Sequence, residues 1–441
     1  MIIYYCRSTK NLDICYILNN QNFIPMKSVM SERMMFLFLL TGFCAVAFGQ
    51  AVGYVEFKGK IIDRQTNAPL TYCNVMVSEM NVATVTNTEG EFTLKLPAGN
   101  EDKKLIIRYI GYKSRSVGLK ELLARNGVIV MDMVAVQLPQ IDVLTQDAAF
   151  LVKTMFDKVP ENYPQHDMFM TAFYRESIRK SKTYVSLSEA VVDIQKPSYS
   201  SFKYDAAKIY KSRKQTDYSR LDTLVFKLMG GPYNNLLMDV IKHPDVLFAD
   251  DMYKKYFFTF DKVEWMDDRL IYVVNFNPYP QKEEALYSGK LYIDALTMAL
   301  KSVVFNLNLE NEDKATEMFI KKKPLNARVT PIEANYRMDY VEKNGKWYYA
   351  YSRIELGMKI NWKRKLFNSN YYSTVEMAIT DSENSSENKA IKFAERLKST
   401  VIISETADGF ADPDFWGPLN VIEPEKPIEA AIKKIQKQLE K

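Results

Sequence analysis

The feature that most constrains this chain is the stretch from Val55 to Met133, where short β-branched and aliphatic runs alternate with turn residues. Alternation of apolar and polar residues over about four to eight positions is typical of strands with one buried face. Between two such runs, the polar segment from Arg64 to Leu70 contains Pro69, which fixes φ and cannot donate to a ladder. The stretch therefore predicts a small β-sandwich.

The expected strands of this sandwich follow the apolar runs. They are Gly59–Asp63, Tyr72–Val77, Ala83–Leu94, Leu105–Tyr112 and Val128–Met133. Residues Asn87 to Gly90 predict a turn inside the third run. Because side chains alternate along a strand, Phe92, Leu94 and Leu96 are expected to share one face.

Three motifs follow one another in this stretch. They are G-x-I-x-D-x-x-T-x-x-P-L from Gly59, T-x-x-x-G-x-F from Thr86, and Y-x-G-Y from Tyr109. Together they resemble the carboxypeptidase-regulatory-like domain, an Ig-like or transthyretin-like sandwich common at the front of secreted and outer-membrane proteins of Bacteroidetes. The resemblance covers about a fifth of the 441 residues, with Cys73 in place of the usual alanine and Asn87 in place of aspartate. It implies an accessory module without catalytic ligands.

A secretory signal peptide is predicted ahead of the sandwich. Lys27 and Arg33 precede the apolar run Met34 to Phe48, which ends at the small residue Gly49. The run is too short to span a membrane comfortably. We therefore expect export, removal of residues up to about Gly49, no transmembrane helix afterwards, and a periplasmic or outer-membrane-associated location.

The residues before this signal, 1 to 25, show no targeting pattern, so they are interpreted as an upstream extension. Initiation at Met26, Met30 or Met34 would account for them. The residue before Cys44 is not the small residue that precedes a lipobox cysteine. Cys44 is therefore interpreted as part of the apolar signal segment and not as a lipid anchor. After cleavage only Cys73 remains, which excludes an intramolecular disulfide.

The composition is that of a globular protein with two or three domains, with 47% apolar and 26% charged residues. The net charge is +5, and it falls to +3 without the first 49 residues. This balance gives no case for a nucleic-acid partner.

After the sandwich the pattern predicts an extended linker, Val136–Val143, and then a helix, Gln146–Val159, ended by Pro160. Long aromatic-rich strands follow, and their alternation predicts a sheet with two different faces. They are Phe169–Ile178, Thr183–Ile194, Phe202–Tyr210, Lys255–Val263 and Leu270–Phe276. Tyr233–Phe248 interrupts them and predicts a helix crossing the sheet.

Hairpins are expected next. Tyr287–Ile293 turns at Asp294–Thr297 into Lys301–Leu309, and Glu333–Glu342 turns at Asn344-Gly345 into Lys346–Ile360. A last strand, Tyr371–Thr380, precedes a loop predicted at Asp381–Lys389.

The hairpin sequence Ser288-Gly289-Lys290-Leu291-Tyr292-Ile293-Asp294 resembles the G-x-(L/I)-Y-I-D strand of LolA-like half-barrel envelope proteins. That resemblance implies a curved antiparallel sheet with one apolar face. Leu291 and Ile293 would lie opposite Tyr292, and helix Tyr233–Phe248 or the C-terminal stripe would cover the apolar face.

The C-terminal tail contains an aromatic turn region, Asp408–Pro418, and a helix opened by Glu425-Lys426-Pro427. Its apolar stripe is Ile428, Ile432, Ile435 and Leu439. The expected fold class is mostly β (α+β), a sandwich followed by a large curved antiparallel sheet with a few covering helices. The expected division is 1–49 extension and signal, 50–136 sandwich, 137–160 linker and helix, 161–385 sheet, and 386–441 helical tail.

No catalytic constellation is found in the sequence. A zinc hydrolase needs converging histidines and carboxylates, but His166 and His243 are isolated. The pairs Glu283-Glu284 and Asp250-Asp251 favour solvated loops over acid–base work, and Asn311-Glu312-Asp313 lacks calcium-loop spacing. Nucleophile-elbow and phosphate-loop motifs are absent. We expect no catalytic, metal or cofactor residues, and ligand-binding residues are unknown.

Two further residue groups favour structural roles over binding. The triplets Lys321-Lys322-Lys323 and Lys363-Arg364-Lys365 fit strand ends better than lipid headgroup sites. The tyrosines Tyr348, Tyr349, Tyr351, Tyr371 and Tyr372 fit sheet packing better than a glycan platform.

The sequence therefore favours a non-enzymatic exported envelope protein that binds a hydrophobic ligand, or a protein or glycan partner, through its curved sheet. A structural or interaction protein with a filled sheet core, binding partners through the sandwich, is the alternative. A glycan-active hydrolase with two converging carboxylates stands third. Lipid or an envelope protein is the expected partner.

Overall fold

The computed structural model describes residues 53–124, 126–134, 147–216, 228–248, 252–266, 269–280, 284–319, 327–363, 368–384, 390–409 and 415–430. The predicted signal peptide, the linker Val136–Val143, Asp250-Asp251, Lys321-Lys322-Lys323 and most of the C-terminal stripe lie outside these residues. The chain divides into two compact units, and all described residues belong to the second, 52–441.

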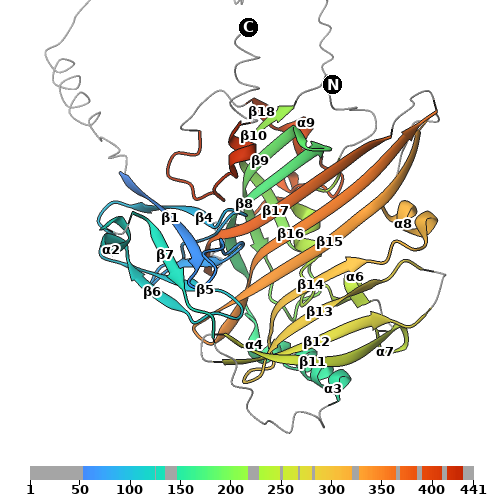
Figure 1. Ribbon diagram of the computed structural model, residues 1–441, viewed down its shortest axis with the longest axis horizontal. Helices are drawn as coiled ribbons and strands as arrows, with labels where there is room; N and C mark the ends of the chain where they lie inside the picture. The colour runs from blue at the N-terminus through green and yellow to red at the C-terminus, as the bar shows by residue number, and fades with distance from the viewer. Residues whose placement is uncertain are drawn as a thin grey trace, which may run out of the picture. The chain divides into compact units, whose positions relative to one another are not determined.

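The N-terminal part forms two facing sheets (Figure 1). One contains β4 (Glu91–Pro97), β1 (Tyr54–Asp63) and β7 (Val128–Met131), and the other contains β3 (Ala83–Val85), β2 (Asn74–Val77), β5 (Lys104–Arg108) and β6 (Arg115–Gly118). Phe92, Leu94 and Leu96 are buried between them. The predicted sandwich is confirmed. Strand β6 and helix α2 (Leu119–Ala124) were not predicted.

The turn from Asn87 to Gly90 requires an asparagine-type side chain at its start and a glycine at its end. The Asn87 side-chain oxygen accepts hydrogen bonds from the backbone nitrogens of Glu89 and Glu91, both at 2.9 Å, so asparagine serves where aspartate is usual. Gly90 has φ of +76°, and a Cβ there would lie 2.6 Å from the Ile61 oxygen. Only glycine fits this position. The strand expected at Leu105–Tyr112 ends at Arg108, because Gly111 turns at φ of +84°.

The second part is an eleven-stranded sheet in which β8 to β17 are all antiparallel and two-residue β18 adds in parallel. The order is β11-β12-β13-β14-β15-β16-β17-β8-β9-β10-β18, so the last long strand pairs with the first. The strands are β8 (Met168–Lys180), β9 (Thr183–Lys196), β10 (Ala206–Thr216), β11 (Tyr256–Met266), β12 (Arg269–Pro278), β13 (Tyr287–Asp294), β14 (Leu300–Leu307), β15 (Ala327–Lys343), β16 (Lys346–Trp362), β17 (Ser369–Asn384) and β18 (Asp408–Gly409).

Both predicted hairpins are confirmed. Asn344 and Gly345 have φ of 52° and 76°, the left-handed pair that a two-residue hairpin needs. Asp294 caps the other turn by accepting hydrogen bonds from the Thr297 nitrogen and hydroxyl at 2.8 Å. The loop predicted at Asp381–Lys389 is wrong for its first four residues, which extend β17 against β8. The strand predicted at Phe202–Tyr210 begins only at Ala206.

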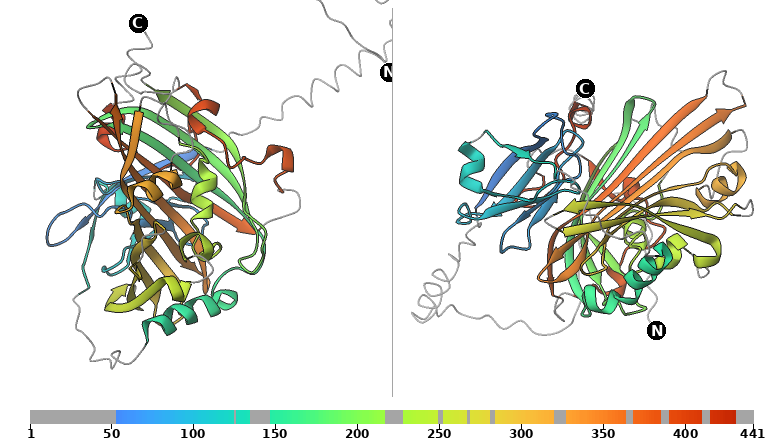
Figure 2. Two further views of the ribbon diagram at one scale, coloured as in Figure 1. Left: turned by 90° about the vertical axis from the view of Figure 1, so that its right-hand side faces the viewer. Right: turned by 60° about the horizontal axis from the view of Figure 1, so that its bottom comes forward.

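Helices cover one face of this sheet, which we call the helix-side face (Figure 2). They include α3 (Ala148–Asp157), α5 (Pro232–Leu237) and α6 (Pro244–Phe248). Val159, expected at the end of the first helix, instead begins α4 (Val159–Asn162). Further short helices are α7 (Met252–Lys255), α8 (Glu312–Phe319), α9 (Ile403–Thr406) and η3 (Phe393–Glu395), and residues 426–430 are helical at the end of the described chain.

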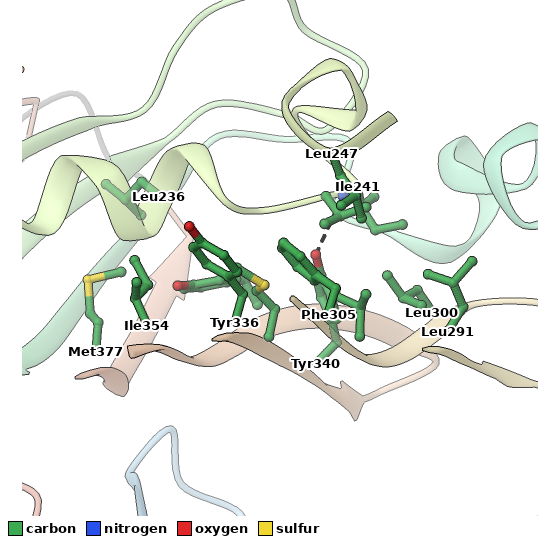
Figure 3. Packing of buried hydrophobic residues seen from close by; sticks show 14 of the residues in the cluster. Leu236, Ile241, Leu247, Leu291, Leu300, Phe305, Tyr336, Tyr340, Ile354 and Met377 are labelled. Carbon is green, nitrogen blue, oxygen red and sulfur yellow. Dashed lines mark hydrogen bonds between the residues drawn. The ribbon is translucent and has the colours of Figure 1, made fainter. Parts of the chain in front are cut away.

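The single helix predicted at Tyr233–Phe248 is wrong, because α5 ends at Leu237 and α6 starts at Pro244. Proline lacks an N–H and disfavours helical geometry at the preceding residue, which here is His243. The segment nevertheless crosses the sheet as expected: Leu236, Ile241 and Leu247 pack on sheet residues (Figure 3). Leu291 and Ile293 are both buried in this core, and Tyr292 lies on the other face.

The opposite face, which we call the sandwich-side face, contacts the sandwich and the C-terminal segment 415–428. Tyr72 of the sandwich stacks on Tyr351 at 5.7 Å between ring centroids. Trp416 packs edge-on against Phe173, and Ile428 packs on Leu187. Residues 415–428 therefore lie on this face and not on the helix-side face.

Candidate ligand-binding site on the helix-side face

A row of six charged residues crosses six neighbouring strands on the sandwich-side face. In register they are Arg337, Arg353, Glu376, Arg175, Glu189 and Arg213. Arg353 Nη1 lies 2.7 Å from Glu376 Oε1, and Glu189 lies within 2.8 Å of both Arg175 and Arg213. The arginines hold the pKa of Glu189 below its usual value despite burial. This charged row is a compensated ion network.

The C-terminal segment completes that network. Arg175 Nη2 donates to the Ile422 carbonyl oxygen at 2.7 Å. Asn420 bridges to the outer edge of β4: its Oδ1 accepts from the Lys95 nitrogen at 2.7 Å and its Nδ2 donates to the Lys95 oxygen at 3.0 Å. The segment thus binds the sheet and the sandwich at once.

On the helix-side face a buried lysine holds the covering segment. Lys196 Nζ lies 2.7 Å from Asp205 Oδ2 and 2.8 Å from Asp239 Oδ2. Burial lowers the pKa of Lys196, but attraction to the two aspartates outweighs it and raises that pKa. Tyr340 and Tyr199 donate to Asp239 at 2.7 and 3.1 Å. Asp239 lies between α5 and α6. This network therefore holds the covering segment, residues 232–248, against the sheet.

A second polar group on this face is not compensated. Glu176 on β8, Ser188 on β9 and Ser373 on β17 are at most 1% exposed, yet Glu176 Oε1 and both serine oxygens have no hydrogen-bond partner among the described residues. Glu176 and Ser188 are direct cross-strand partners, so their Cβ atoms lie about 5 Å apart. Ser373 is the diagonal neighbour of Glu176. We call these three residues the polar cluster.

The chemistry of the polar cluster is set by burial. The other Glu176 oxygen accepts a hydrogen bond from the Tyr174 hydroxyl at 3.0 Å. Burial raises the pKa of Glu176 to about 7, and the Tyr174 hydrogen bond opposes this rise. Buried polar atoms without a partner cost about 1–3 kcal/mol each, so they are rare in native proteins. Glu176, Ser188 and Ser373 therefore mark a place where a polar group from elsewhere would be stabilising.

Apolar clusters flank the polar cluster on both sides. On one side lies the large core under α5 and α6, which includes Ile354 and Val375. On the other lies a smaller cluster at the far ends of the strands, which includes Ile178, Met358 and Tyr371. Several residues that pack on this smaller cluster are only partly buried: Leu228, Phe319, Leu356 and Trp362.

The residues considered from the sequence lie elsewhere. His166 is exposed in a bend, whereas His243 is buried just before α6, with its ring stacked on Tyr204 at 5.4 Å and its pKa lowered by burial. Cys73 is buried as expected, and its thiol lies 3.5 Å from the Arg108 oxygen. Glu284 pairs with Lys255 on the surface. These residues are not brought together into one site.

The structural interpretation is confirmed for Tyr349, Tyr351 and Tyr371, which are at most 1% exposed, whereas Tyr348 and Tyr372 are only partly buried. Asn311 precedes helix α8, and Glu312 and Asp313 lie in the first turn of that helix. Within the described residues, no group of three or more histidine, cysteine, aspartate or glutamate side chains is placed to hold a metal. No helix in the described part of the chain is long and apolar enough to cross a membrane.

Three surface or junction cavities lie away from the polar cluster. One of about 40 Å³ separates β2 and β3 from β15 and β17, and one of about 130 Å³ lies beside Arg269 and Asp294. An open groove of about 380 Å³ exposes Asn306 and Asn335. Their linings are largely polar or shared with the sandwich, unlike the apolar surroundings of Glu176.

Comparison with solved structures finds distant similarities. A DUF1329 family protein from Desulfovibrio piger ATCC 29098 shares 10% identity with a TM-score of 0.24, covering 55% of this chain and 95% of that one. A solved structure that concerns lipid–protein interactions in lipovitellin shares 10% identity with a TM-score of 0.26. The match covers 58% of this chain and 28% of that one. Both TM-scores are low, so neither similarity bears on function.

The search of curated proteins finds no match. A family model does match the sandwich: its description is CarboxypepD_reg-like domain, and it covers residues 57–141. The match includes the turn at Asn87 and the Tyr-x-Gly-Tyr end described above. The resemblance seen in the sequence is confirmed by this match of residues 57–141 to the CarboxypepD_reg-like domain.

Proposed function

We propose that this chain is a non-enzymatic exported protein that binds an amphiphilic ligand, with a long apolar chain and a polar end, on the helix-side face. The observation that carries the proposal is the polar cluster, buried without partners between two apolar clusters. Ligand sites are mostly apolar with a few converging polar groups, and this part of the sheet has that composition.

The part of the helix-side face under α5 and α6 is already packed with side chains, so the ligand must lie elsewhere on that face. Under α5 and α6 the sheet is a packed core in which Leu236, Ile241 and Leu247 meet Phe305 and Tyr340 (Figure 3). The Lys196 network fixes that cover, so binding there would break buried ion pairs. We therefore place the ligand beyond it, along Ile178, Leu356 and Met358 at the far ends of the strands.

Export and the absence of catalysis are parts of the same proposal. The charged, apolar and small residues between Lys27 and Gln50 support export, with a mature chain that starts near Gln50. The two histidines of the chain lie apart, and the CarboxypepD_reg-like domain serves as an accessory module. Neither the charged row nor the Lys196 network resembles an acid–base pair open to a substrate.

Native mass spectrometry with solvent extraction tests this proposal. The full chain, expressed with its own N-terminus in a Gram-negative host, is purified from the envelope fraction without detergent. We expect a mature N-terminus near Gln50 and a co-purifying lipid or other amphiphile at near-stoichiometric amount. Protein that retains residues 34–48, or that carries no amphiphile and takes up none from mixed lipids, would contradict the proposal.

A further inference from the structure

The polar cluster also has a chemical preference, and the inference drawn from it rests on the proposed function. We propose that the cluster holds the polar end of the ligand and selects a hydrogen-bond donor, a hydroxyl or an ammonium group, over a carboxylate or phosphate. The geometry is that of three side chains on adjacent strands β17, β8 and β9, all pointing to the same face.

The acceptor in this cluster is Glu176. A carboxylate only accepts hydrogen bonds, and Tyr174 satisfies just one of its two oxygens. The Ser188 and Ser373 hydroxyls can each donate and accept. A hydroxyl or ammonium group placed beside Glu176 would donate to its Oε1; a hydroxyl could also accept a hydrogen bond from a neighbouring serine, whereas an ammonium could only donate to that serine. Either group would satisfy Glu176 Oε1 and reach one of the two serines, which lie on the strands on either side of β8.

An anionic head group would be disfavoured for an electrostatic reason. Glu176 forms no ion pair with any residue in the described ranges, whereas Glu189, on the other face of the same sheet, touches two arginines. Two negative groups close together in a dry interior repel strongly, because the effective dielectric is low. A fatty acid would therefore have to enter with a proton shared between its carboxylate and Glu176.

The apolar part of the ligand has a defined direction. Ile178 follows Glu176 by two residues on the same face of β8, and Leu356 is the cross-strand partner of Ser373. Leu356 packs on both apolar clusters and is only partly buried. A chain attached to a head group at Glu176 would run over Ile178 and Leu356 towards Met358.

Calorimetric titration with three ten-carbon probes, above the pKa of about 7 at which Glu176 ionises, tests this inference. Decylamine, 1-decanol and decanoate share one apolar chain, so differences between them report the head group alone. We expect decylamine and decanol to bind wild-type protein at least tenfold more tightly than decanoate. Equal or tighter binding of decanoate would overturn the inference, while leaving the proposed function intact. Binding of none of the three would overturn both.

Variants locate the effect. Glu176→Gln should weaken decylamine binding about tenfold to hundredfold, which is the range for losing a hydrogen bond to a charged group. Ser177→Ala is the matched control, because Ser177 is buried on the same strand but points to the opposite face. It should bind all three probes as wild type does. Unchanged decylamine affinity in Glu176→Gln would overturn the inference.

A second variant covers the case in which Glu176→Gln does not fold. Ser188→Ala removes one hydroxyl of the cluster and leaves the carboxylate in place. We expect it to weaken decanol, which both donates and accepts, by about threefold to tenfold, with the same direction in Ser373→Ala. Decanol affinity that is unaffected by both serine substitutions would count against the cluster as the head-group subsite.

Discussion

Two rows of buried residues lie one position apart along the same strands. Charges in one row are paired with opposite charges, whereas polar atoms in the other row are not paired. The charged row on the sandwich-side face contains Arg175 and Glu189, and each charge there meets an opposite charge at 2.7 to 2.8 Å. The neighbouring row on the helix-side face contains Glu176 and Ser188, whose Oε1 and Oγ atoms lack hydrogen-bond partners among the described residues. Both rows are buried, so burial alone does not explain the difference.

The two faces differ in which parts of the chain supply partners to their buried polar groups. On the sandwich-side face, the C-terminal segment and the sandwich bring hydrogen-bond acceptors to the row, such as the Ile422 carbonyl on Arg175. On the helix-side face the Lys196 network receives Asp239 from the covering segment, but Glu176 receives only Tyr174 from its own strand. The charges of the charged row are thus paired within the chain, whereas the polar cluster gathers three atoms without partners among the described residues on neighbouring strands of the helix-side face.

The largest expected effect is on the charged row. Arg175→Met should lower the free energy of unfolding by about 3–5 kcal/mol, because it leaves the buried Glu189 with one arginine fewer and frees the Ile422 carbonyl. Urea unfolding of both proteins measures this. Arg179→Met, on the same strand but partly exposed, should change it by less than about 1 kcal/mol. A loss below 1 kcal/mol in Arg175→Met would show that the network does not stabilise the face.

The pH dependence of stability should separate the two rows. The native pKa of Glu176 is raised to about 7 from 4.5 by burial, so between these values the native state binds more protons than the unfolded state. Stability therefore falls as pH rises from 4.5 to 7, by about 3 kcal/mol from this group. Glu176→Gln should lack that loss. Unfolding curves of variant and wild type that stay parallel over this range would contradict the burial of an uncompensated carboxylate.

The smallest expected effect concerns the link made by Asn420. Asn420→Ala removes both hydrogen bonds to the Lys95 backbone and should cost about 1–2 kcal/mol. It should also speed proteolysis within residues 415–428, which mass spectrometry of the fragments locates. Asn306→Ala, on the uncovered part of the same face, serves as the control. Equal cleavage rates in both variants would mean that Asn420 does not hold the segment.

Much of the fold follows from local patterns. Alternation along β8 predicts that Tyr174 and Glu176 share one face while Arg175 and Ser177 share the other. The Asn344-Gly345 pair predicts a tight hairpin, because both residues adopt positive φ readily. These features depend on neighbours within a few residues, which a sequence displays directly.

Other features depend on residues far apart in the chain. Nothing near Arg175 indicates that the Ile422 carbonyl lies beside it, and nothing near β17 indicates that it pairs with β8. The polar cluster was missed for the same reason, since β17 brings Ser373 beside Glu176. A weak local signal was present: Glu176 stands at an apolar position of the β8 alternation. The break before Pro244 also had a signal in the sequence, because proline restricts the residue ahead of it.

Photo-crosslinking with a decyl probe that carries a diazirine on its chain and a hydroxyl head tests the central claim most directly. The claim is that the helix-side face binds an amphiphile at the polar cluster and that the sandwich-side face does not. We expect adducts on β8, β16 and β17 at helix-side residues such as Ile178, Leu356 and Met358, competed by decanol and reduced in Glu176→Gln. Adducts on the sandwich-side face, or labelling that decanol does not compete, would contradict the account.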